Sequence, residues 1–202
     1  IKDTYKNTIA HKALLKSSTA RKVAMSLSRL FLITFFSFHI FINMISVFSA
    51  DTFNAMSHFM GYNPVIQFVM QPILIAGVVF HFVMGIVLEL QNKKARPVAY
   101  AKYDGAANAS WASRNMIISG LVVLAFLGLH FYDFWVHEMV YKYVEVNAIN
   151  ETRYFEALVH KFESPIRTGS YVGAFVLLSL HLWHGFRSSF QSVGFDNKFS
   201  ST

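Results

Sequence analysis

The chain has 202 residues, of which 54% are hydrophobic and only 14% are charged, whereas ordinary soluble domains carry about 25% charged residues. It contains no cysteine, which excludes disulfides, iron–sulfur ligation and thiol catalysis within these residues and leaves histidine as the main candidate metal ligand. The formal net charge is +7. Because the hydrophobic residues are gathered into long runs, the sequence predicts an all-α membrane protein.

Four hydrophobic runs predict a transmembrane helix bundle with four spans, all in a single membrane domain. The expected spans cover residues 27–49, 71–90, 113–136 and 168–191. Before the first span, residues 1–25 form a polar and basic N-terminal arm. Two interpretations of this arm stay open, a solvated amphipathic segment and a surface that docks a partner or anionic lipid.

The distribution of positive charges predicts the orientation of the spans. The arm and the 91–112 loop are rich in Lys and Arg, the 50–70 connection has neither, and the 137–168 loop has five acidic residues against four basic ones. Cytoplasmic loops carry the excess of Lys and Arg, so we expect the N-terminus, the 91–112 loop and the C-terminal tail to lie inside. Within the long outer loop, apolar residues at helical spacing over 155–162 predict a short surface helix.

Each predicted span carries one histidine deep in its hydrophobic run, namely His39, His81, His130 and His181. An ionisable residue in that environment is a functional hypothesis by default. Measured from a charged residue at the inner end of each span, the helix rise places them about 15, 12, 24 and 9 Å deep, respectively. His81 therefore pairs with His181 near the inner side. His130 lies near the outer side, where His39 is its remaining partner.

Two facing imidazoles inside a helix bundle are typical of bis-histidine haem ligation. Gly85 and Gly185 favour this interpretation for the inner pair, because each follows its histidine by one turn on the same helix face, where a missing side chain lets a flat macrocycle approach. Histidines that only join helices by hydrogen bonds, and a proton relay, are the alternatives. His184, one turn after His181, is a competing ligand.

Polar groups near the two levels are candidate contacts for haem propionates and for a quinone. Propionates need donors near the inner surface, where the candidates are Ser26, Arg29, Trp111, Arg114 and Arg187. A quinone needs a proton donor or acceptor beside the outer haem, where the candidates are Asn54, His58, Gln67 and Gln71. We expect His58 and Gln71 to lie within reach of that haem. For any one of these residues alone, membrane topology or a polar surface loop is a sufficient explanation.

Several stretches carry a resemblance to a known family. They are Thr52-Phe53-Asn54 followed by His58-Phe59-Met60, QNKKARPVAY at 91–100, SWASRNM at 110–116 and HLWHGFRSSFQSVG at 181–194. With the four ordered histidines, they resemble the cytochrome b membrane subunit of succinate:quinone oxidoreductases (succinate dehydrogenase and fumarate reductase), in the single-subunit, two-haem form and with a Bacteroidetes-like character. The resemblance covers nearly the whole chain from about residue 20.

The resemblance implies that His81 and His181 ligate the haem b nearer the dehydrogenase, and that His39 and His130 ligate the distal haem b. It implies an electron-transfer enzyme subunit of the bacterial cytoplasmic membrane, with menaquinone as substrate. The implied partners are a flavoprotein subunit, an iron–sulfur subunit, membrane lipid and quinone, without nucleic acid; a homo-oligomer of the complex stays open. Dicarboxylate catalysis is not expected in this chain, which has no dinucleotide fingerprint and no cysteine.

The sequence departs from the family in one respect. The family has five membrane helices and four are predicted here, so the resemblance implies that the last helix is missing from this sequence. Two other functions remain alternatives. One is a structural anchor with little or no haem, and the other is the cytochrome b subunit of another quinone-linked dehydrogenase, such as a hydrogenase or formate dehydrogenase.

Overall fold

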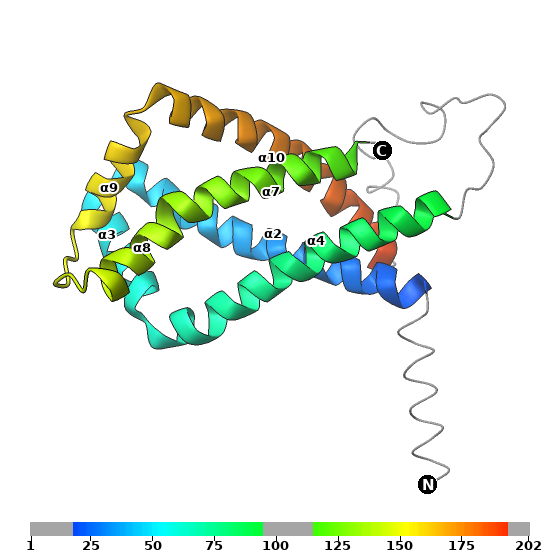
Figure 1. Cartoon of the computed structure of the whole chain (residues 1–202), viewed down its shortest axis with the longest axis horizontal. Helices are drawn as coiled ribbons and strands as arrows, with labels where there is room; N and C mark the ends of the chain where they lie inside the picture. The colour runs from blue at the N-terminus through cyan, green and yellow to red at the C-terminus, as the bar shows by residue number, and fades with distance from the viewer. Residues whose placement is uncertain (1–17, 95–114, 194–202) are drawn as a thin grey trace, which may run out of the picture.

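A computed structural model describes residues 18–94 and 115–193, and the regular structure within them is helical, with no strand (Figure 1). The part before the gap consists of α2 (Ser18–Phe48), α3 (Ala50–Tyr62), the π-helical turn η1 (Ile66–Met70) and α4 (Gln71–Lys94). The part after it consists of α7 (Met116–His130), the π-helical η2 (Phe131–Val136), α8 (His137–Met139), the π-helical η3 (Val140–Val144), α9 (Arg153–Phe162) and α10 (Pro165–Val193).

Three helices are long and apolar enough to cross a membrane. They run over Ala20–Phe48, Ile66–Lys94 and Met116–Val144, each with 29 residues. Since a helix rises about 1.5 Å per residue and the hydrocarbon core is about 30 Å thick, each exceeds the required length. This confirms the all-helical character expected from the sequence, and the three long helices are consistent with a multi-pass membrane protein. Helix α10 also has 29 residues, but its serines, glycines and two histidines make it less apolar than the other three.

The helices extend beyond the spans expected from hydrophobicity. The second begins at Ile66, and the third continues to Val144 through η2 and η3, where a loop was expected from residue 137. An ion pair between Lys142 Nζ and Glu138 Oε1 (2.7 Å) spans one turn of this extension, a spacing that supports a helix. Helix α10 starts at Pro165, since proline at the first helical position loses no intrahelical hydrogen bond.

The four long helices lie side by side as a bundle (Figure 1). Helix α2 packs against both α4 and α10, and α10 packs against α7. The contact between α4 and α7 is smaller. Helices α3 and α9 lie at one end of the bundle and pack against each other.

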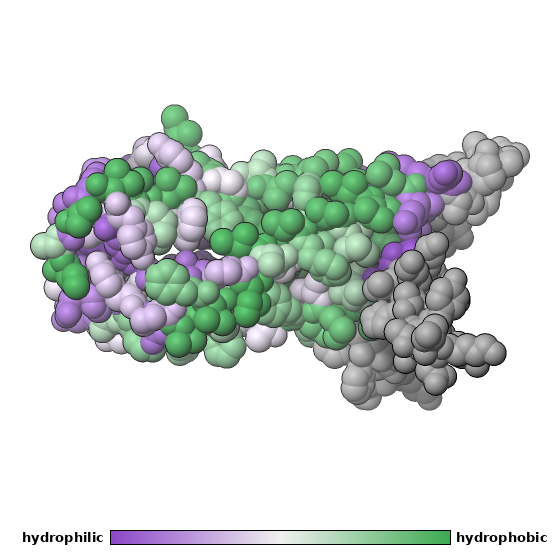
Figure 2. Space-filling model, turned by 60° about the horizontal axis from the view of Figure 1, so that its bottom comes forward, coloured by the Kyte–Doolittle hydropathy of each residue, from purple (hydrophilic) through white to green (hydrophobic). Residues whose placement is uncertain are grey.

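The surface of the bundle is apolar along its middle. Figure 2 shows a wide hydrophobic zone between hydrophilic residues at the two ends. Large side chains on this surface include Phe38 (65% exposed), Phe41 (62%) and Phe68 (70%). Within the described residues, the buried hydrophobic side chains are Met25, Phe53, Tyr171 and Ala174, and α4 and α7 have none. The helices thus present their apolar side chains outward, as expected in lipid.

The end of the bundle that holds α3 and α9 is closed by specific polar contacts. Ser49 caps α3, where its hydroxyl accepts a hydrogen bond from Thr52 N (3.1 Å). The buried Asn54 accepts a hydrogen bond from Phe155 N at 2.8 Å through its Oδ1. The Phe53 and Phe155 rings pack edge to face, with centroids 6.4 Å apart. The surface helix expected near 155–162 is therefore α9, which the buried asparagine fixes to α3.

Candidate functional site: two levels of histidine

The rings of His39 and His130 approach each other edge-on from two helices of the bundle. His39 lies in α2 and His130 is the last residue of α7, and their ring centroids are 5.6 Å apart with an interplanar angle of 89°. Phe35 stacks on His39 at 5.6 Å, and Phe126 lies 6.0 Å from His130. The two histidines that sequence reasoning paired only by depth and elimination thus form one aromatic cluster.

His39 and His130 differ in their hydrogen bonds. The Asn43 amide donates to His39 Nε2 at 3.4 Å and to the His39 carbonyl at 2.8 Å. His130 Nδ1 is buried and has no hydrogen-bond partner within the described part of the chain. Buried polar atoms are nearly always satisfied, so this nitrogen is an exception at a position already singled out by the sequence.

His81 and His181 form a second level, each in contact with a serine of a neighbouring helix. His81 Nδ1 lies 3.0 Å from Ser28 Oγ of α2. His181 Nδ1 lies 3.0 Å from Ser119 Oγ of α7. The two histidines lie within electrostatic range of each other and of Arg29. His81 and His181 thus each contact a helix that also carries one histidine of the first pair.

The two serine–histidine contacts belong to an internal repeat. Helix α2 carries Met25, Ser28, Phe35 and His39, and α7 carries the same residue types at the same spacing, Met116, Ser119, Phe126 and His130. Helices α4 and α10 share the pattern His-x-x-x-Gly, at His81 and His181. Sequence reasoning noted the histidines and glycines but missed the serines. Aligning the first and third hydrophobic runs on their histidines would have revealed them.

The glycines of this pattern face the methionines of the repeat. A Cβ on Gly85 would lie 3.6 Å from Met25 Cε, and one on Gly185 would lie 3.8 Å from Met116 Cε. Both are ordinary van der Waals distances, so helix packing alone does not require glycine at either position. At Gly120 of α7, a Cβ would lie 3.4 Å from His181 Cε1, at the short end of the same ordinary range. Gly120 thus places α7 in contact with the His181 ring.

Two of the residues predicted to hold propionates lie in α2 beside Ser28, the residue that contacts His81. Ser26 is fully buried, and its hydroxyl has no hydrogen-bond partner in the described part of the chain. The Arg29 side chain approaches the Gly185 position, since a Cβ built there would lie 3.9 Å from Arg29 Cδ. Trp111 and Arg114 lie outside the described residues, as does the side chain of Arg187.

The structure divides the predicted quinone contacts into two groups. Gln67 accepts a hydrogen bond from the Tyr143 hydroxyl, and Gln71 accepts one from Trp135 Nε1, both at 3.3 Å. These two bonds join the start of the second long helix, Ile66–Lys94, to the later part of the third, Met116–Val144. Sequence reasoning did not identify the two aromatic partners.

Asn54 and His58 lie in α3 and take no part in those two hydrogen bonds. Asn54 serves to anchor α9, as described above. The His58 ring stacks on Tyr62 with centroids 4.6 Å apart, and its Nε2 lies 3.7 Å from Glu151 Oε1. Both residues therefore have structural partners at the end of the bundle.

A buried carboxylate lies one turn beyond His130. The side chain of Asp133 accepts hydrogen bonds from Arg167 Nη1 at 2.5 Å and from the Tyr171 hydroxyl at 3.0 Å. The Tyr171 ring packs near His130, with centroids 6.2 Å apart. This triad therefore links the surroundings of His130 to α10, and it was not predicted as a unit.

A second ionic cluster joins the end of the third long helix to α3 and α9. Glu138 pairs with both Lys142 and Arg153, and Lys142 Nζ donates to the Gly61 carbonyl at 2.5 Å. Burial, with the negative charge of Glu138, raises the pKa of the nearby Tyr154 hydroxyl. For Arg153, burial alone would lower the pKa, but its hydrogen bond and ion pair with Glu138 outweigh this and raise it.

Two further observations limit the kind of site. No group of three or more His, Asp or Glu side chains that could hold a metal ion occurs among residues 18–94 and 115–193, whereas a haem iron needs only two axial ligands. An open groove of about 650 Å³ runs along α4 beside Ile75, Val79 and Val83. None of the four histidines lines this groove, so it is separate from the histidine site.

Comparison of the chain with models of known protein families, with curated proteins and with solved structures finds no match. The functional interpretation therefore depends on the residues and their geometry.

Proposed function

We propose that this chain is the membrane anchor and di-haem cytochrome b subunit of a succinate:quinone oxidoreductase. In this role it passes electrons between an iron–sulfur subunit and menaquinone across the bilayer. The observation that carries the proposal is the close approach of His39 and His130 from different helices, with a second pair of histidines held at another level of the same bundle.

The outer pair, His39 and His130, could supply two imidazole ligands to one metal ion. The two rings come from different helices, α2 and α7, and their centroids lie 5.6 Å apart. A haem iron with two histidine ligands would take them from such a pair. His130 Nδ1 is buried and has no hydrogen-bond partner in the described part of the chain. A contact that served only helix packing would be expected to satisfy this nitrogen, so the missing partner supports a ligand-binding role for the pair.

The levels are far enough apart for two separate haem groups. Ser28, which contacts inner His81, precedes outer His39 by eleven residues in α2, about 16 Å along the helix axis. At the inner level, Gly85 and Gly185 follow their histidines by one helical turn, and the nearest atoms to a Cβ built at either position belong to flexible side chains, Met25 and Met116. Both levels thus supply two histidines from different helices, which is the donor set that a b-type haem uses.

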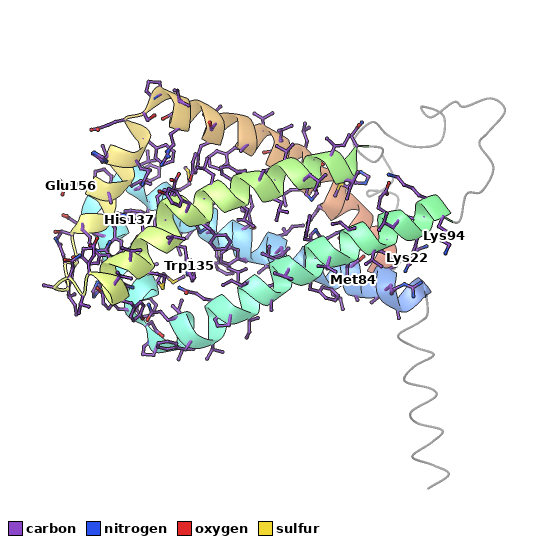
Figure 3. All side chains as sticks on the ribbon, viewed as in Figure 1. Lys22, Met84, Lys94, Trp135, His137 and Glu156 are labelled. Atoms are coloured by element: carbon purple, nitrogen blue, oxygen red, sulfur yellow. The ribbon has the colours of Figure 1, made fainter. Side chains whose placement is uncertain are left out.

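The membrane arrangement that we propose has four spans with the N-terminus inside. Helix α10 is the fourth span, since it equals the other three in length and packs against α2 and α7. Lys22 and Lys94 lie at one end of the bundle, and Glu156 lies at the opposite end (Figure 3). Excess Lys and Arg favours the cytoplasmic side, so the end with the two lysines is the inner one.

In this proposal the haem groups, when bound, supply the one-electron carriers. The four histidines hold them, and Arg29 and Ser26 are the described donors for propionates of the inner group. At the outer end, Gln67 and Gln71 with their partners Tyr143 and Trp135 supply polar groups that can bind and orient a quinone. The partner subunits, a flavoprotein and an iron–sulfur protein, carry out the dicarboxylate chemistry.

Purification of the tagged chain from its native membrane tests the assignment to a succinate-linked complex. We expect a flavoprotein and an iron–sulfur protein to co-purify, and succinate to reduce b-type haem in the preparation. Co-purification of a hydrogenase or formate dehydrogenase instead would assign the cytochrome to another complex. A stable preparation without haem would contradict the cytochrome function and support a structural anchor.

A further inference from the structure

Two serines occupy matched positions next to the inner histidines. Ser28 and Ser119 have the same place in the repeat of α2 and α7, and each lies 3.0 Å from the Nδ1 of a histidine on the neighbouring helix. We infer that they are positioning residues that hold His81 and His181 in the tautomer with the proton on Nδ1, which leaves Nε2 free to bind a metal.

A hydroxyl group has a single proton, which fixes the direction of these hydrogen bonds once its acceptor is assigned. Ser28 Oγ lies 2.8 Å from the Met25 carbonyl oxygen and Ser119 Oγ lies 3.0 Å from the Met116 carbonyl oxygen, and each hydroxyl can donate to that carbonyl or to the facing ring nitrogen. We assign the proton to the carbonyl, the acceptor that serines of these helices use elsewhere, so that each serine oxygen accepts from the facing ring nitrogen. The ring Nδ1 then carries the hydrogen, and the lone pair of the neutral imidazole lies on Nε2.

Other serines in the long helices show that this arrangement is specific. Ser37 donates to the Ile33 carbonyl, and Ser179 donates to the Phe175 carbonyl, in each case at the helix's own preceding turn. Both hydrogen bonds are exposed, and neither hydroxyl has a histidine partner in the described contacts. A backbone bond alone is therefore the ordinary use of serine in these helices, and the histidine contact is the additional feature of Ser28 and Ser119.

In the described contacts, neither His39 nor His130 has a serine partner equivalent to Ser28 or Ser119. The Asn43 amide donates to His39 Nε2, and His130 Nδ1 has no partner in the described part of the chain. A hydrogen bond from the second ring nitrogen fixes the orientation of a ligating histidine and raises its basicity. Given the proposed function, the serines therefore strengthen the inner ligands, favour the oxidised form of the inner haem and lower its reduction potential.

The tautomer itself can be measured without haem. The full-length chain, labelled with ¹⁵N-histidine and reconstituted in lipid from a haem-deficient host, is examined by solid-state NMR. We expect protonated Nδ1 and unprotonated Nε2 signals for His81 and His181, assigned by their loss in His81→Ala and His181→Ala. Ser28→Ala and Ser119→Ala each remove the preference at their own partner, while Ser28→Thr, which keeps the hydroxyl, preserves it. A proton on Nε2 of both rings in the unmodified chain would overturn the inference.

Redox titration of the haem-loaded chain gives a second readout. Loss of such a partner typically weakens metal binding about 10- to 100-fold, and a tenfold weakening confined to the oxidised form raises a one-electron potential by about 59 mV. We expect this rise at the inner haem in Ser28→Ala and Ser119→Ala, with no change in the matched controls Ser37→Ala and Ser179→Ala. If the chain binds no haem but keeps the Nδ1 protons, the proposed function fails and the tautomer assignment stands. If haem binds but neither the NMR signals nor the reduction potential responds to the serine substitutions, the proposed function stands and the tautomer assignment fails.

Discussion

The ion pair between Asp133 and Arg167 gives a quantitative prediction, because its two members are buried to different degrees. Asp133 is 1% exposed, whereas the Arg167 side chain is 30% exposed. Removing one partner of a buried pair costs about 3–5 kcal/mol when it leaves an uncompensated buried charge. Arg167→Gln leaves the buried carboxylate without its cation. Asp133→Asn leaves an arginine that can turn toward water.

We therefore expect Arg167→Gln to lower the free energy of unfolding by about 3 kcal/mol. Asp133→Asn should cost less, about 1–2 kcal/mol, because an amide can still accept the Tyr171 hydrogen bond. Reversible unfolding of the detergent-solubilised chain, followed by circular dichroism, measures both. The matched control is Lys93→Gln, which breaks the exposed pair of Lys93 with Glu89 (3.4 Å) and should change stability by less than about 0.5 kcal/mol. An effect of Arg167→Gln no larger than the control, or smaller than that of Asp133→Asn, would refute this reasoning.

Three further predictions concern the end of the bundle near α3 and α9. Gly61→Ala should lower the free energy of unfolding by about 1 kcal/mol, because the new Cβ would lie 3.2 Å from a lysine ammonium and 3.3 Å from a glutamate oxygen. The control Gly173→Ala, whose Cβ would have no atom within 4 Å, should not destabilise the chain in the same unfolding assay. The raised pKa of Tyr154 means that its neutral form stabilises the fold fully below the ordinary tyrosine pKa of about 10, and that this contribution is lost as the pH rises toward the folded-state pKa. Tyr154→Phe should flatten that alkaline loss in a pH series, and an unchanged series would contradict the assignment. Asn54→Ala should speed amide hydrogen exchange in α9 and cost about 1 kcal/mol, since it removes the acceptor for Phe155 N; Asn54→Asp keeps an acceptor and should retain protection.

The helical and membrane-spanning character of the chain could be predicted from hydrophobic runs alone. The ends of the helices could not, because they depend on contacts between distant residues. Residues 137–144 contain charged side chains and were expected to form a loop, but Glu138 pairs with Lys142 within the helix and with Arg153 across the cluster. The number of spans and their orientation stay predictions, since α10 is long but less apolar than the other three.

In the candidate site, too, positions along one helix could be predicted from the sequence, whereas contacts between helices could not. Depth along a helix could group the histidines into two levels, because the helix rise is constant. It could not identify Ser28 and Ser119 as histidine partners, since a serine in an apolar helix most often bonds its own backbone. It also could not predict that Asp133 would meet Arg167 and Tyr171, which come from another helix.

The most direct test of the central claim is the ratio of haem b to polypeptide in the purified chain and in single histidine variants, measured by pyridine haemochrome absorbance. The account predicts about two haem groups per chain, about one in His39→Ala or His81→Ala and none in the double variant. The control His160→Ala, at an exposed position of α9, should keep both. The claim would be contradicted if His39→Ala and His81→Ala left the ratio of haem to polypeptide unchanged, or if the chain bound no haem at all.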